Sequence, residues 1–163
     1  MTPIKINNEY TVEITDLTFR GKGVSKIDDF TVFVDKSVPG DVVKIKIYDV
    51  KKTYAHATLI EIVSPSEHRS EILDERLDTI PLQHLKYHKQ LEYKRKWLYD
   101  TLKRSIDIKL EQIEDTIGMK DPWYYRNKAQ IPTRMIDGQL ETGIFKSESN
   151  TLVPVENYYI QDK

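Results

Sequence analysis

The feature that most restricts the fold is a series of short β-type segments in the first 63 residues, each closed by a turn. In segment 43–48, VKIKIY, apolar and polar residues alternate, so one face of the strand is buried and the other is wet and basic. Segments 10–14, 30–34 and 54–63 carry the β-branched and aromatic residues that strands favour. Such a series predicts a small closed barrel of five strands over residues 1–63, for which OB-like and SH3-like topologies both stay open.

The middle of the chain predicts a linker and then a long helix. Residues 64–84 begin with Ser-Pro-Ser, are acidic and contain few apolar residues, which is typical of a linker with little regular structure. Residues 85–106 predict one helix, because Tyr87, Leu91, Leu98 and Leu102 fall at helical spacing, with Trp97 beside them.

The last part of the chain returns to a β pattern. Segments 124–134, 140–145 and 152–160 predict antiparallel strands, and Asp137-Gly138 is a strong hairpin signal. Residues 85–163 are therefore expected to form a second, small α+β unit built from one long helix and antiparallel strands.

Composition excludes several kinds of chemistry. The 163 residues include no cysteine, which removes disulfides, thiolate zinc sites, cysteine-held iron–sulfur clusters and a cysteine nucleophile. The first residues lack the apolar core of a signal peptide, and no apolar run approaches the roughly 20 residues that span a bilayer. These observations favour a cytoplasmic protein. The net charge is −1, but residues 86–109 carry eight Lys or Arg against three acids. A local basic face of this kind can attract phosphate, although a solvated helix face is the simpler reading.

The first 63 residues resemble a TRAM domain, an RNA-binding barrel of OB-like topology. The residues that carry the resemblance are the Gly21–Gly23 turn, Phe33-Val34, the Pro39-Gly40-Asp41 turn, and Pro65, Ser66 and Arg69.

The rest of the chain resembles the central domain of bacterial RNA uridine-5-methyltransferases, a class I family that uses S-adenosylmethionine. The matching segments are Pro81–Leu85, Gln90–Lys94, Tyr125–Lys128, Gly143–Phe145 and Val153–Asn157. The resemblance covers only the first portion of that family. It implies an RNA-binding part of a 23S rRNA or tRNA (uracil-5-)-methyltransferase, with ribosomal or transfer RNA as partner.

The chain departs from the family in its cofactor residues. Residues 77–80 and Tyr158 stand where family members carry cluster-binding cysteines, so the iron–sulfur site is absent. S-adenosylmethionine, the nucleophilic cysteine and the general base belong to a methyltransferase domain expected beyond residue 163. We therefore expect no catalytic residue and no cofactor here, and a chain that is inactive alone. A free-standing adaptor that binds RNA or protein, without a catalytic domain, is the alternative.

RNA binding is the chemistry that these residues allow. OB-type barrels bind single strands through basic grooves and stacked aromatic rings. The barrel candidates are Phe19, Arg20, Lys22, Lys26, Lys51, Lys52 and Tyr54. The candidates in the second unit are Lys94, Arg95, Lys96, Tyr125, Arg126 and Lys128. No metal site is expected, because His84 and His88, although four residues apart, have no evident third ligand.

Overall fold

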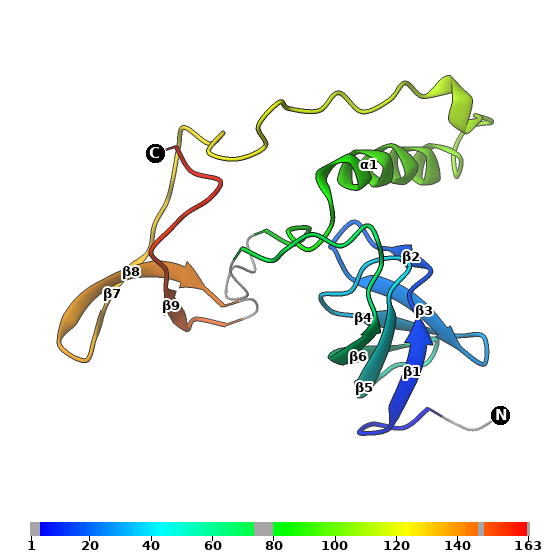
Figure 1. The fold of residues 1–163 in the computed structure, drawn as a ribbon, viewed down its shortest axis with the longest axis horizontal. Coiled ribbons are helices and arrows are strands. Elements are labelled where there is room, and N and C mark those ends of the chain that lie inside the picture. The colour runs from blue at the N-terminus through cyan, green and yellow to red at the C-terminus, as the bar shows by residue number, and fades with distance from the viewer. Residues whose placement is uncertain (1–3, 74–79, 147–148, 163) are drawn as a thin grey trace. The chain divides into compact units, whose positions relative to one another are not determined.

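The computed structural model describes residues 4–73, 80–146 and 149–162 (Figure 1). The chain divides into two compact units, each built from two separate stretches of sequence. Unit 1 contains Met1–Glu71 and Pro81–Thr116, and unit 2 contains Ile72–Ile80 and Ile117–Lys163. Each unit is described by itself below.

Unit 1 contains a six-strand sheet, which confirms the prediction of an OB-like β unit. Its strands follow the order β1-β5-β6-β4-β3-β2, with β4 and β6 parallel and the other pairs antiparallel. Their bounds are β1 Glu9–Glu13, β2 Asp16–Leu17, β3 Gly23–Ile27, β4 Phe30–Val34, β5 Val42–Val50 and β6 Tyr54–Ser64.

The barrel closes because its first strand is bent in two. The part β1 pairs with β5, and the short part β2 pairs with β3 at the other edge of the sheet. Between them, the Thr15 amide donates to the Val24 carbonyl at 2.8 Å. Counted as one bent strand, β1 and β2 bring the total to the five that the sequence predicts. Strand β3 is the one of these five for which the sequence analysis names no segment.

The barrel core is small and aliphatic. Val32, Val34, Val43, Ile45 and Ile47 are all fully buried, as the period-two alternation of their strands requires. The residues between them on each strand therefore point outward, and these form the surface described below.

The predicted linker is anchored to the barrel over its first residues. Arg69 donates from Nε and Nη2 to the fully buried Asp41 carboxylate, at 3.1 and 2.7 Å. The same carboxylate accepts hydrogen bonds from the Val38 and Ser66 amides. The Arg69 backbone also bridges to Leu85. Residues 64–70 thus belong to the barrel unit, while the part of the predicted linker at residues 74–79 lies outside the described residues.

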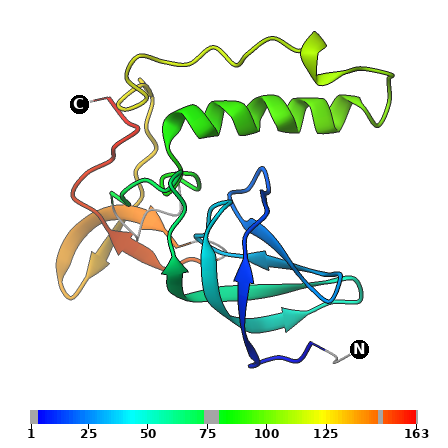
Figure 2. The same cartoon turned by 45° about the vertical axis from the view of Figure 1, so that its right-hand side comes forward.

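The helix α1, Tyr87–Leu102, packs on the barrel (Figure 2). Tyr93 and Trp97 contact the buried cluster of Leu17, Val38 and Leu85, and Trp97 Nε1 donates to the Leu17 carbonyl at 2.9 Å. The predicted helix at 85–106 is therefore shorter in the structure. Of the residues predicted for its apolar face, Trp97 contacts the barrel, whereas Leu98 is 49% exposed; Tyr93, which also contacts the barrel, was not among them.

Beyond α1 the chain folds back along the helix as far as residue 116. This stretch contains the short 3-10 helix η1, Leu110–Gln112. Arg95 donates to the Ile113 and Leu110 carbonyls, and the Thr116 hydroxyl donates to the Leu91 carbonyl. The predicted domain boundary at residue 85 therefore differs from the observed packing, since residues 81–116 join the barrel.

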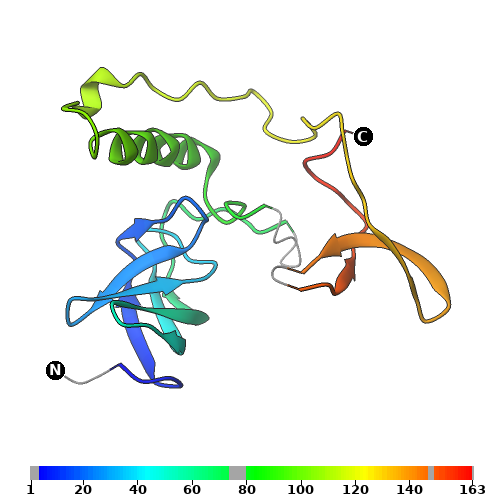
Figure 3. The same ribbon diagram turned by 180° about the vertical axis from the view of Figure 1, so that it is seen from behind.

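Unit 2 contains a three-strand antiparallel sheet in the order β7-β8-β9 (Figure 3). Its strands are β7 Thr133–Ile136, β8 Gln139–Phe145 and β9 Leu152–Pro154, and the β7–β8 turn is the predicted Asp137-Gly138. The strands predicted at 124–134 and 152–160 are longer than the observed ones. Residues 124–132 and 155–160 do not belong to strands, so the prediction is wrong there. Arg126 and Gln161 form an isolated parallel bridge.

Candidate nucleic-acid interface

The outward side chains of β4, β5 and β6 gather aromatic rings on one face of the barrel. Phe33 lies between the buried Val32 and Val34, so its ring must point away from the core. In the register of the sheet, Phe33 stands opposite His56, and Thr31 stands opposite Tyr54. Residues directly opposite one another share a face of a sheet.

Four rings contact one another there, and we call Phe33, Tyr48, Tyr54 and His56 the aromatic face. The His56 ring lies 5.5 Å from the Phe33 ring and 5.4 Å from the Tyr54 ring, and is stacked on Tyr48 at 5.9 Å and 15°. Tyr48 reaches this position where an irregularity between Ile47 and Asp49 shifts the β5–β6 register. Tyr48 is 45% exposed, so the face is open to a ligand.

One edge of the aromatic face is a polar group of three side chains. Lys22 Nζ lies 2.8 Å from an Asp35 carboxylate oxygen and 3.5 Å from the Tyr48 hydroxyl, which donates to Asp35 at 3.3 Å. Burial disfavours the charge on Lys22, but the hydrogen bond and charge of Asp35 outweigh it and raise the pKa of Lys22. Lys22 therefore keeps its charge at the edge of the rings.

His56 at the centre of the aromatic face is held neutral. Burial lowers its pKa, and the nearby Lys22 charge lowers it further. Its Nδ1 atom is buried and has no hydrogen-bond partner among the described residues. A neutral ring in contact with three other rings offers a surface for flat, uncharged groups.

The loop between β2 and β3 presents the first predicted residues. Phe19 is 70% exposed, and the Arg20 guanidinium lies 5.5 Å from the centre of its ring. Gly21 has a φ of +79°, and a side chain there would collide with the Pro81 carbonyl. The loop is therefore fixed against residue 81, with Phe19 and Arg20 left in solvent.

The other predicted barrel residues lie on β3, on β6 and in the β5–β6 turn. Tyr54 is a member of it, and Lys26 is on β3 rather than in the loop, in register with Thr31 and hence on the same face. Lys51 pairs with Asp49 at 3.2 Å, and Lys52 is exposed in the β5–β6 turn. Lys22, Lys26 and Tyr54 thus lie on or at the edge of the aromatic face, and the contact of the predicted barrel residues with RNA stays a prediction.

The predicted cations on α1 are differently placed. Lys94 is exposed, whereas Arg95 binds backbone carbonyls and pairs with Asp115 at 3.2 Å. Lys96 pairs with Asp16 and Asp100, at 2.8 and 3.1 Å. A phosphate would have to compete with these internal partners.

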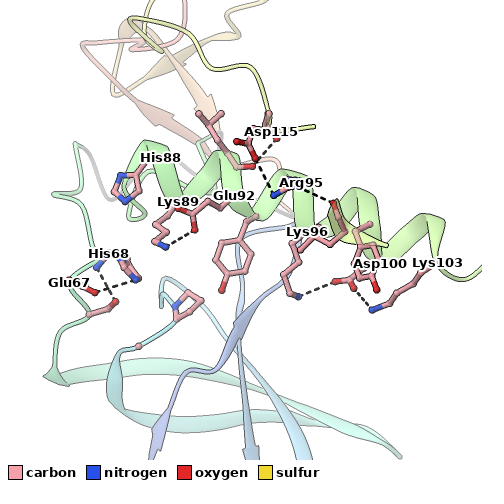
Figure 4. A pocket seen from close by; sticks show the side chains of 18 of the residues that line it. Glu67, His68, His88, Lys89, Glu92, Arg95, Lys96, Asp100, Lys103 and Asp115 are labelled. Atoms are coloured by element: carbon pink, nitrogen blue, oxygen red, sulfur yellow. Dashed lines mark hydrogen bonds and ion pairs between the residues drawn. The ribbon is translucent and has the colours of Figure 1, made fainter. Parts of the chain in front are cut away.

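A groove of about 1150 Å³ lies between α1 and the barrel loops (Figure 4). Its cations point towards acids: Lys89 towards Glu92, and both Lys96 and Lys103 towards Asp100. Because these charges cancel within the groove, the groove attracts an anion less strongly than its number of lysines suggests.

The remaining predicted residues lie in unit 2. Tyr125 is 51% exposed. Arg126 and Lys128 line a small cavity described further below. Their predicted role in binding RNA is likewise untested.

The sequence has no cysteine to hold an iron–sulfur cluster, and residues 77–79 of the positions in question lie outside the described residues. Ile80 and Tyr158 both pack against the apolar cluster of Ile144 and Val155. Neither side chain can replace a thiolate ligand, so the group does not fit these residues.

Neither a metal centre nor a membrane-spanning helix is found in the described part of the chain. The described residues contain no group of three or more His, Asp or Glu arranged to hold a metal ion. His84 is buried, and His88 instead faces His68 with ring centres 6.4 Å apart. Among the described residues, no helix combines the length and apolar character needed to cross a lipid bilayer.

The candidate RNA-binding residues predicted from the sequence do not include Phe33, Tyr48 and His56, which the structure places on the aromatic face. The alternation of strands that places Val32, Val34 and Ala57 in the core also places Phe33 and His56 outside it. That signal was available, since an outward aromatic residue on a strand has no core to fill. Tyr48 depends on the β5 irregularity, for which the sequence offers no clear sign.

The comparisons with known proteins agree with the barrel. Residues 3–60 match the TRAM domain family. The chain is 40% identical over 163 residues to an uncharacterized RNA methyltransferase of Enterococcus faecalis, covering 98% of this chain and 36% of that protein. A Streptococcus mutans protein with the same description gives the same identity and coverage. The chain therefore spans about a third of the length of these curated relatives.

A solved structure has a related fold over most of the chain. The Pyrococcus abyssi tRNA (uracil-54, C5)-methyltransferase matches with a TM-score of 0.62, covering 94% of this chain and 33% of that one. The sequences are 22% identical, so the likeness concerns the fold.

Proposed function

Because residues 3–60 are a TRAM domain and the chain matches part of two RNA methyltransferases, we propose that it is the RNA-binding portion of an RNA (uracil-5-)-methyltransferase. Its ligand is single-stranded or locally unpaired RNA, of ribosomal or transfer type, in the cytoplasm. The aromatic face is the binding surface.

The observation that carries the proposal is the aromatic face with cations beside it. Aromatic side chains bind single-stranded nucleic acid because every base has a flat face to stack, whatever the sequence. Arg20, Lys26 and Lys52 have no acidic partner among the described residues, whereas Lys22 and Lys51 are paired. Three to five cations of the barrel are thus available for phosphates.

The chain by itself is proposed to be inactive in methyl transfer. Methylation of uracil at carbon five in this family uses a cysteine thiolate, because a thiolate is nucleophilic near neutral pH. The sequence contains no cysteine. The chemistry would have to come from a methyltransferase domain, while this portion recognises RNA.

The test is binding of a fluorescent single-stranded RNA, followed by anisotropy, for the parent chain and for Phe33→Leu. This change keeps an apolar side chain and removes a ring. Loss of one stacked base costs about 1–3 kcal/mol, so affinity should fall roughly fivefold to 150-fold. Phe145→Leu, the same change in unit 2, is the control and should leave affinity unchanged.

Salt gives an independent check. With three to five phosphate contacts on a single strand, raising salt from 50 to 200 mM should weaken binding by about 20- to 130-fold. If the parent chain fails to bind RNA at low salt, the proposal is wrong, and the adaptor function takes its place. If Phe33→Leu binds as tightly as the parent, RNA binds elsewhere on the chain.

A further inference from the structure

Unit 2 contains a second, smaller cavity that differs in chemistry from the groove along α1. Its volume is about 330 Å³, near the lower end of the range of small-molecule sites. It is bounded by two chain segments that run side by side. The Arg126 amide donates to the Ile160 carbonyl at 2.9 Å, and the Asp162 amide donates to the Arg126 carbonyl at 2.8 Å.

The floor of the cavity is apolar and well packed. Ile144 and Ile160 are each 8% exposed, and Ile80 and Tyr158 pack in the cluster that includes Ile144. Gly143 also lines the cavity, where a side chain would collide with the Val153 carbonyl. This floor suits one face of a flat ring.

Two polar atoms in the wall are buried without partners. The Tyr158 hydroxyl and Gln161 Oε1 have no hydrogen bond among the described residues. Leaving such a group without a hydrogen bond costs about 1–3 kcal/mol, so two buried polar atoms without a partner need an explanation. A ligand that donates and accepts hydrogen bonds at the edge of a ring would satisfy both.

Two cations complete the lining. No acidic partner for the Arg126 or Lys128 side chain is found in the described parts of the chain, unlike the cations along α1. Guanidinium and ammonium groups without a carboxylate attract phosphate.

We propose that this cavity binds a single nucleotide, with its phosphate at Arg126 and Lys128 and its base against Tyr158 and Gln161. The lining combines the three parts of a nucleotide site: a cation pair, a flat apolar floor and hydrogen-bonding groups. The site is separate from the aromatic face and does not depend on the proposed function. The nucleotide is either free or one unstacked residue of an RNA strand.

The experiment is a nuclear magnetic resonance titration of the 15N-labelled full chain with uridine 5′-monophosphate, uridine and a uridine pentanucleotide. Uridine monophosphate should shift the amides of Arg126, Gly143, Ile144 and Gln161, and should bind more tightly than uridine. A shift with both the mononucleotide and the pentanucleotide identifies a general nucleotide site. A shift with the pentanucleotide alone identifies an RNA residue as the ligand. Both outcomes support the proposal.

Variants separate recognition from folding. Arg126→Gln should weaken binding of the ligand that shifts these amides by about tenfold or more, because it removes a charged hydrogen bond. Lys120→Gln, the same charge change at an exposed position of unit 2, should change it less than twofold. Tyr158→Phe should also weaken binding, whereas it would have no effect if the hydroxyl served no ligand.

The proposal is overturned if none of the three probes shifts the cavity amides, or if uridine binds as tightly as its monophosphate. It is also overturned if Arg126→Gln retains the parent's affinity while its spectrum stays dispersed. Phe33→Leu should leave the cavity shifts intact, so failure at the aromatic face is distinguishable from failure here.

Discussion

Replacing Arg69 by Met tests how firmly the barrel holds the chain that follows it. Asp41 is fully buried, and Arg69 supplies two of its four hydrogen bonds and its only opposite charge among the described residues. Removing one partner of a buried ion pair typically costs 3–5 kcal/mol, because the other charge is left buried and unpaired. Arg69→Met should therefore lower the free energy of unfolding by about 3–5 kcal/mol.

The measurement is urea unfolding followed by circular dichroism in the far ultraviolet. Lys44→Met is the control, since Lys44 pairs with Glu9 on the exposed surface, where ion pairs contribute little. Adding Asp41→Asn to Arg69→Met should recover part of the loss, because the unpaired charge is then gone. If Arg69→Met lowers the free energy of unfolding by less than about 1 kcal/mol, this reasoning is refuted. Residues 64–70 would then be better described as the linker that the sequence predicts.

The stability at acid pH provides a second test of the ion pair between Asp41 and Arg69. Burial opposes the charge on Asp41, but the Arg69 hydrogen bonds and the Ser66 and Val38 amides together lower its pKa. A carboxylate with a lowered pKa stabilises the fold above its unfolded value of 3.8, and this stability is lost as pH falls through the folded value. The difference between parent and Arg69→Met should therefore shrink below pH 3.8.

Two further predictions concern single residues of unit 1. Gly21→Ala should destabilise unit 1 more than Gly138→Ala destabilises unit 2. Both glycines have a positive φ, at which an alanine costs about 1–2 kcal/mol. Only at Gly21 would the added side chain also collide with Pro81. Amide exchange in each unit measures the two effects, and equal losses would show that the loop moves freely away from Pro81. Burial lowers the pKa of His84 to about 4. Because the unfolded chain takes up this proton first, stability should fall by up to about 3 kcal/mol between pH 6.5 and 4, and His84→Leu should remove that slope in urea unfolding.

The barrel could be predicted because its signal is local. The alternation in β5 and the strand-favouring composition of β4 and β6 are each visible in a run of consecutive residues. The observed strands lie within a few positions of those runs. Strand β3 was missed because GVSKI contains a glycine and two polar residues. Its strand character comes from pairing with β4, and Ser25 is buried there because its hydroxyl donates to the Glu13 carbonyl.

The helix α1 shows what a local sequence pattern does not predict, namely which of its residues contact the barrel. Leucines at helical spacing suggested the buried face, but α1 docks through Trp97 and Tyr93, the latter outside that pattern. The docking partner, Leu17, is distant in sequence, so no periodicity within the helix reveals it. For the same reason the aromatic face was only partly foreseen, because its rings come from three strands whose register was not known.

The division of the chain into interleaved units has a consequence for its synthesis. Ile72–Ile80 belongs to the same unit as Ile117–Lys163, yet the whole of Pro81–Thr116 is translated between them. At 5–20 residues per second, Ile80 emerges roughly 2 to 7 seconds before residue 117, and its apolar partners Ile144 and Val155 later still. Unit 1 is complete once Thr116 has emerged, whereas unit 2 then still lacks its second stretch. A ribosome that pauses within α1 would leave a chain with a complete barrel and an apolar side chain whose neighbours do not yet exist.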